Sequence, residues 1–155
     1  MDREPKEKLA PQYLTGIPGI DMQHTELFFF CSKLLGNLKD GSFSPDLASE
    51  SVKEILEGLE AHYLTEEILL DMIDFPRMAE HKTKHEKILN EVKDNIGAFS
   101  TANAVEMGRI IRAFRDNLLT HISVFDREYV LHVENIISLK EKFKITALKA
   151  RSIAG

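Results

Sequence analysis

The glycine and proline residues of this 155-residue chain stand almost entirely at junctions, and long stretches of helical periodicity separate them. The junctions lie near residues 16–19, 41–45, 76 and 97. Between them apolar residues recur at every third or fourth position, and no stretch alternates as a half-buried strand would. Short connections between amphipathic helices of similar length predict an all-α fold, an up-down-up-down four-helix bundle.

Four main helices are expected, over residues 21–38, 45–72, 77–98 and from 104 past 126, with a further junction at 100–103. Asp21 and Ser44 are the expected N-caps of the first two helices. Asn103 and Glu106 have the spacing of a capping box before the fourth helix. The positions expected to face the core in the first two helices are Leu27, Phe28, Cys31, Leu34, Leu35, Leu47, Val52, Ile55, Leu56, Leu59 and Leu69.

Composition narrows the class of protein. With 43% hydrophobic residues the chain can bury one core, and its longest apolar run, residues 27–31, is far too short to span a membrane. A net charge of -5 argues against binding to nucleic acid, which favours a basic surface. Cys31 has no partner for an internal disulfide, so we expect a cytoplasmic protein in which this thiol is a small buried hydrophobe.

The C-terminal residues differ in character from the rest. We divide the chain into an N-terminal arm (1–15), a bundle (16–130) and a C-terminal helical extension or linker (131–155). Residues 127–155 hold six basic and three acidic side chains, a net charge of +3, which leaves -8 on residues 1–126. Two interpretations stay open: a terminal helix packed back on the bundle, or a connector toward a partner protein or an output domain.

Histidines and carboxylates occupy related positions on all four expected helices. The second helix carries a histidine and a glutamate four residues apart, and the third carries two histidines at the same spacing. This spacing places two side chains on one helix face, one turn apart. Together with one position on the first helix and two on the fourth, the pattern predicts a metal site in the bundle core. The expected ligands are His24, His62, Glu66, His81, His85, His121 and Asp126.

The spacing of His121 and Asp126 requires a local distortion. Five residues apart on a regular helix, the two side chains would point about 140° away from each other. A single π-bulge between them brings Asp126 onto the face of His121, and such bulges are common at functional sites. We therefore predict a π-bulge over residues 121–126.

The donor set limits the metal and the number of ions. Nitrogen and carboxylate oxygen without sulfur suit iron, zinc, copper or manganese. Five histidines and two carboxylates are too many for one tetrahedral zinc but suit two metals. If both carboxylates bridge, and one oxygen bridges as well, two roughly six-coordinate sites are one ligand short. A small molecule would bind at that vacancy.

These motifs resemble the hemerythrin family, and within it the bacterial hemerythrins, over roughly Gly16–Tyr129. The resemblance rests on Gly-Ile-Pro-Gly-Ile-Asp-Met-Gln-His at 16–24, His-Tyr-Leu-Thr-Glu-Glu at 62–67, Phe-Pro followed by His-Lys-Thr-Lys-His within 75–85, and His-Ile-Ser-Val-Phe-Asp at 121–126. It implies two irons with an oxo or hydroxo bridge that bind dioxygen reversibly, for carriage, storage or delivery. Many relatives carry a tryptophan before the first helix; here Tyr13 is expected to take over its packing.

The resemblance also implies how the ligands divide. His81, His85 and His121 would bind one iron, and His24 and His62 the other. The glutamate and the aspartate would bridge both irons, so the iron with two histidines keeps the open position. A dry pocket is required around it. The side chains expected to line that pocket are Leu118, Ile122, Tyr63 and Phe28.

Two further residues and two other functions fall outside this interpretation. Glu67 is expected as a solvated neighbour, and His132 as a surface or interface histidine. An alternative function is an O2 or redox sensor coupled through the C-terminal helix to an output domain. A di-iron enzyme is not expected, because the Glu-x-x-His motif of ferritin-like enzymes is absent from the sequence.

Overall fold

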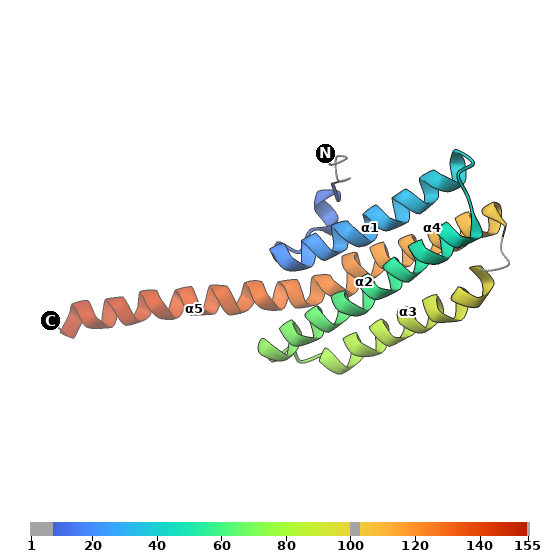
Figure 1. Ribbon diagram of the computed structural model, residues 1–155. Coiled ribbons are helices and arrows are strands. Elements are labelled where there is room, and N and C mark those ends of the chain that lie inside the picture. The colour runs from blue at the N-terminus through green and yellow to red at the C-terminus, as the bar shows by residue number, and fades with distance from the viewer. Residues whose placement is uncertain (1–7, 100–102, 155) are drawn as a thin grey trace.

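The computed structural model describes residues 8–99 and 103–154, and all regular structure in these ranges is helical (Figure 1). Four helices form the bundle: α1 (Pro18–Lys39), α2 (Pro45–Met72), α3 (Met78–Phe99) and α4 (Ala104–Thr120). Both α1 and α3 contact α2 and α4, so the four helices surround one core. The predicted four-helix bundle is confirmed. Residues 1–7 of the expected arm and 100–102 of the expected junction lie outside the described ranges.

Two of the predicted helix starts are confirmed. The side chain of Ser44 accepts a hydrogen bond from the backbone N–H of Leu47 (3.2 Å), and α2 begins at the next residue. Asn103 and Glu106 form the capping box that opens α4. These local side-chain bonds satisfy backbone N–H groups that have no partner inside the helix.

The predicted N-cap Asp21 is wrong. Helix α1 begins earlier, at Pro18, whose fixed φ suits a first turn, and Asp21 lies inside it. The Asp21 carboxylate instead accepts hydrogen bonds from the backbone N–H of Thr15 (2.7 Å) and of Gly16 (3.1 Å). Gly16 takes a φ of +79° at this corner, which glycine adopts without strain. Asp21 therefore ties the segment before α1 to the helix.

The core positions predicted on α1 are buried, as are Val52, Ile55 and Leu59 on α2. Of the other positions predicted on α2, Leu56 and Leu69 are half-buried, and Leu47 is exposed, because the buried positions in that part of the helix are Ala48 and Ser51, on another face. A 3-10 turn, η1 (Pro11–Tyr13), precedes α1, and its Tyr13 packs against the edge of the core.

The fourth helix continues far beyond the bundle. After α4 comes a π-helical segment, η2 (His121–Asp126), which confirms the predicted distortion, and then α5 (Arg127–Ala154). Figure 1 shows α5 as a rod that leaves the bundle at the end where α2 ends. The interpretation in which residues 127–155 pack back on the bundle is therefore wrong for residues 137–153, which are all exposed. None of the described helices combines the length and apolarity needed to cross a membrane.

Candidate metal centre

The structure brings all seven predicted ligand residues into one buried cluster. They come from α1, α2, α3 and η2, and each has at most 3% of its surface exposed. The five imidazoles present Nε2 to the centre of the cluster, toward one another or toward the two carboxylates. The seven are His24, His62, Glu66, His81, His85, His121 and Asp126.

The π-helical segment is what brings the last two of these residues together. Within η2, His121 Nε2 lies 3.0 Å from Asp126 Oδ1. On a regular helix the same two side chains would point about 140° apart. The extra residue in the π-helical turn thus places His121 and Asp126 on the same side of the helix.

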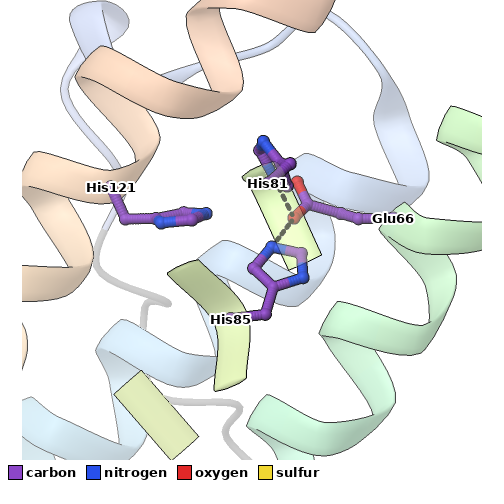
Figure 2. A group of neighbouring side chains, drawn as sticks. All are labelled: Glu66, His81, His85 and His121. Atoms are coloured by element: carbon purple, nitrogen blue, oxygen red, sulfur yellow. Dashed lines mark ion pairs between the residues drawn. The ribbon is translucent and has the colours of Figure 1, made fainter. Parts of the chain in front are cut away.

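One group of donors consists of Glu66, His81, His85 and His121, whose ligand atoms all lie within 4.8 Å of one another. Figure 2 shows their side chains converging from three sides, with Glu66 between the rings of His81 and His85. Glu66 Oε2 lies 3.0 Å from His85 Nε2 and 3.6 Å from His81 Nε2. Three imidazoles and a carboxylate of this size and spacing can surround one ion.

A second group consists of His24, His62, Glu66 and Asp126, within the same limit. The Nε2 atoms of His24 and His62 are 3.0 Å apart. Two nitrogens each about 2.1 Å from one ion, at right angles, are about 3.0 Å apart. The contact therefore matches two neighbouring ligands of a single metal.

The two carboxylates connect the groups. Asp126 Oδ1 lies 3.3 Å from His81 Nε2, and its other oxygen, Oδ2, lies 3.5 Å from His24 Nε2. Glu66 Oε2, which faces the first group, also lies 3.7 Å from His62 Nε2. Each carboxylate thus reaches imidazoles of both groups, the arrangement that a pair of bridging ligands needs.

Burial and the neighbouring histidines have opposite effects on the pKa values of the two carboxylates. Burial and the charge of Asp126 raise the pKa of Glu66, but the close imidazoles of His81 and His85 outweigh both and hold it at about 2. Burial likewise raises the pKa of Asp126, and its contacts with three histidines, His121 first among them, bring it well below its usual value. Both groups are therefore anionic at neutral pH, in a core that favours a compensating cation.

The pKa values of two histidines of the cluster shift in opposite directions. Burial lowers the pKa of His62 to about 4, so this imidazole is neutral and its nitrogen lone pair is free for a metal. Burial also lowers the pKa of His81, but Asp126 and Glu66 outweigh it and raise that pKa to about 9. Without a metal, His81 thus carries the cation that balances the carboxylates.

The donor atoms fit a metal, because many of them have no other partner. Buried polar atoms almost always find a hydrogen bond in folded proteins. Within the part of the chain that the structure describes, six inward-facing atoms of the cluster find none, and they are three imidazole nitrogens and three carboxylate oxygens. They are Nε2 of His81, His85 and His121, Oε2 of Glu66, and Oδ1 and Oδ2 of Asp126.

Three residues orient the ligands from outside. Gln23 Oε1 accepts a hydrogen bond from His62 Nδ1–H (3.1 Å), while Gln23 Nε2 donates to Thr65 Oγ1 (3.0 Å), which fixes the amide. Glu67 Oε1 accepts from His85 Nδ1–H (3.3 Å). The Tyr129 hydroxyl donates to Glu66 Oε1. Such partners fix the tautomer and direction of a ligand.

Two of these residues, Gln23 and Tyr129, were not predicted from the sequence, and the prediction for Glu67 is wrong. Glu67 is not a solvated neighbour, because its side chain reaches His85 and pairs with Lys82 (3.0 Å). Tyr129 lies three residues after Asp126 and hence near its face, a spacing from which its proximity could have been inferred. Nothing in the sequence alone indicated the role of Gln23.

The four predicted pocket residues are all buried in the principal core cluster. Tyr63 contacts one of the candidate ligands directly: its ring stacks on that of His85, with centroids 3.8 Å apart and planes 7° apart. Its hydroxyl has no hydrogen-bond partner among the described residues. Burial raises its pKa well above the usual value, so the group stays protonated. The other three are Phe28, Leu118 and Ile122.

The remaining two predictions concern residues outside the cluster. Cys31 is fully buried, as expected of a small hydrophobe, and burial raises the pKa of its thiol to about 12. His132 is half-buried beside the C-terminal end of α2, where its Nε2 contacts the backbone oxygen of Ile73 (3.2 Å). Within the described ranges, its hydrogen-bond and ring contacts involve none of the seven residues of the cluster.

This fold and this cluster define a class: helical bundles that gather metal-ligating side chains in the core. A family model described as the hemerythrin HHE cation-binding domain matches residues 15–131. The chain therefore belongs to the hemerythrin family, as the sequence motifs indicated. No curated protein and no solved structure matches it significantly.

Proposed function

We propose that this protein binds dioxygen reversibly at a di-iron centre held by the seven clustered residues. The observation that carries the proposal is the pair of overlapping donor groups, in which Glu66 belongs to both and Asp126 faces both. A single ion would leave one group of buried donors without a partner. Two ions with shared carboxylates account for the donors of both groups.

The unequal number of histidines supports a free position on one side. Three imidazoles, those of His81, His85 and His121, belong to one group, and two, those of His24 and His62, to the other. With the carboxylates shared, the second ion has one protein donor fewer. When bound, two irons supply the two electrons that reversible attachment of O2 requires. A nitrogen-rich site with few carboxylates favours binding over oxidative turnover, and we propose no enzymatic role.

The surrounding side chains keep water away from this position. Leu118 is fully buried, and Ile122 and Phe28 are nearly so. Tyr63 covers one face of His85 with its ring. Exclusion of water protects the O2-loaded protein, since water and protons would promote loss of the ligand in a reduced form and leave the irons oxidised. We propose these four residues as the lining of the O2 pocket.

Three further residues hold protons at defined atoms. Gln23 and Glu67 accept the Nδ1–H groups of His62 and His85, so that Nε2 of each ring faces inward. Tyr129 donates a hydrogen bond to Glu66 Oε1 and leaves Oε2 for the metals. The chain thus prepares the ligand geometry before any ion arrives.

A sensor function is the second candidate, and one observation favours it. The segment η2, which holds His121 and Asp126, continues without a break into α5. If either side chain shifts when O2 binds, the shift moves the helix α5 that is attached to it. If this protein is a sensor, protease cleavage within α5 should differ between the reduced and the O2-loaded protein; equal cleavage favours a carrier.

Cycles of oxygenation test the proposed function. Reduced, iron-loaded protein should take up one O2 per two irons, with a visible absorption change that reverses when O2 is removed. His62→Ala should abolish the uptake. His132→Ala should not, because it removes a histidine outside the cluster. Irreversible consumption of O2 by the native protein contradicts reversible binding.

A further inference from the structure

The most conspicuous feature that metal binding leaves unexplained is the extension of α5. We define the α5 extension as residues 136–153. Its large apolar side chains lie in solvent, with Phe143 75% and Ile153 87% exposed. The family match ends at residue 131, just before this extension. Exposure of large apolar groups along a helix of this length is unfavourable in water and indicates that another surface covers them.

Some of the apolar residues of the α5 extension form a stripe with heptad spacing, while Ile137, Ile145 and Leu148 lie on the opposite face of the helix. Successive members are three, four, seven and three residues apart, which keeps them on one face of the helix. Lys140, Lys142 and Lys149 take the positions that flank this stripe. The stripe consists of Ile136, Leu139, Phe143, Ala150 and Ile153.

Charge argues against two such helices pairing with each other. From residue 138 to residue 153 the extension holds five basic side chains and one acidic one, Glu141. Pairing of two α5 extensions would bring two helices of the same positive charge together, and like charges along a shared seam are unfavourable. The partner surface should therefore be apolar with acidic edges.

The outer face of α2 has this character. Leu64, Ile68 and Met72 are spaced by four residues and all are more than half exposed. Glu60 and Asp71 stand along one edge of these three side chains, both exposed. We call these five residues the α2 stripe. With Glu57, which extends it toward the N-terminus, the region is about 23 Å long, close to the ~25 Å of the α5 extension.

We infer that the protein forms a dimer in which the α5 extension of each copy packs on the α2 stripe of the other. Such an exchange is isologous and closes after two copies. Figure 1 supports it, because α5 leaves the bundle at the end where α2 finishes. A second copy facing that end can receive the helix and return its own. Apolar residues meet in the middle of each contact, and lysines meet the acidic edge.

Sedimentation velocity of the full, metal-loaded chain over a range of concentrations and salt tests this inference. We expect a dimer that weakens as salt rises, because the edge contacts are exposed ion pairs. Lys142→Glu with Lys149→Glu should weaken the dimer at least tenfold, and so should Glu60→Lys with Asp71→Lys. All four changes in one chain should restore it, since the charges are exchanged.

Matched controls keep the result specific to these surfaces. Ile145→Ser changes an exposed residue on the opposite face of α5 and should leave the dimer intact. Circular dichroism and metal content should be unchanged in every variant. Glu60→Lys also breaks the exposed pair with Lys93 (2.8 Å), which contributes little to folding.

Three results overturn the inference. A chain that stays monomeric at all concentrations has no such dimer. A dimer that is lost with Phe143→Ser but unaffected by the charge changes on α2 is held by pairing of α5 with itself. A monomer that co-sediments with vesicles of anionic phosphatidylglycerol uses α5 as a membrane-surface helix instead.

Discussion

The three tyrosines of the chain occupy three different environments, and replacing each by phenylalanine separates the roles of their hydroxyl groups. Tyr129 is fully buried and donates to the anionic Glu66. Removing its hydroxyl leaves Glu66 Oε1 without a donor while the ring still fills its space. A hydrogen bond to a charged group contributes about 1.5–3 kcal/mol to stability. We expect Tyr129→Phe to lower the free energy of unfolding by that amount.

The other two tyrosines supply the comparison. The Tyr63 hydroxyl is buried without a partner, so Tyr63→Phe should raise the free energy of unfolding of the metal-free protein by up to about 1 kcal/mol. Tyr13 lies at the edge of the core and its hydroxyl has no hydrogen bond among the described residues. Tyr13→Phe should change stability by less than about 0.5 kcal/mol.

Urea unfolding followed by circular dichroism measures all three differences on metal-free protein. Metal competition then tests the site: loss of a group that orients a ligand typically weakens metal binding 10–100-fold. Only Tyr129→Phe should show this loss. If it unfolds at the native urea concentration and retains metal as tightly, the contact with Glu66 does not hold the ligand and the reasoning is refuted.

Three further predictions follow from individual residues. His81, with a pKa of about 9, must release a proton to bind metal, so metal affinity should rise about tenfold per pH unit from pH 7 toward 9 and then level off. A pH-independent titration over that range contradicts this. Cys31, with a pKa of about 12, should not react with a thiol reagent at pH 8 until the chain unfolds; rapid labelling of folded protein argues against its burial. Leu118→Asn should shorten the lifetime of the O2-loaded protein by admitting water, while Leu118→Met should not; equal lifetimes remove Leu118 from the pocket.

The fold could be predicted from the sequence because its signals are local. Helical periodicity, turn residues and the caps at Ser44 and Asn103 each depend on a few neighbouring positions. The cluster could be predicted for a related reason. Spacings of four place two side chains on one helix face, and the spacing of five between His121 and Asp126 has few structural solutions. One of them, the π-helical segment, is present.

The features that were missed depend on contacts that reach outside a single helix. Asp21 has the character of an N-cap, but Thr15 and Gly16 offer it donors outside the helix. Glu67 bonds to His85, and Tyr129 to Glu66, across 18 and 63 residues of sequence. The spacing of apolar residues in α5 likewise predicts a helix with a covered face. It does not indicate whether the cover comes from the same chain.

The central claim is that seven side chains in one core hold two iron ions. The most direct measurement is metal analysis of the purified chain by mass spectrometry, against protein concentration from amino-acid analysis. We predict two irons per chain, reduced to fewer than one in His62→Ala and unchanged in His132→Ala. One ion per chain, or stoichiometric zinc in place of iron, contradicts the account.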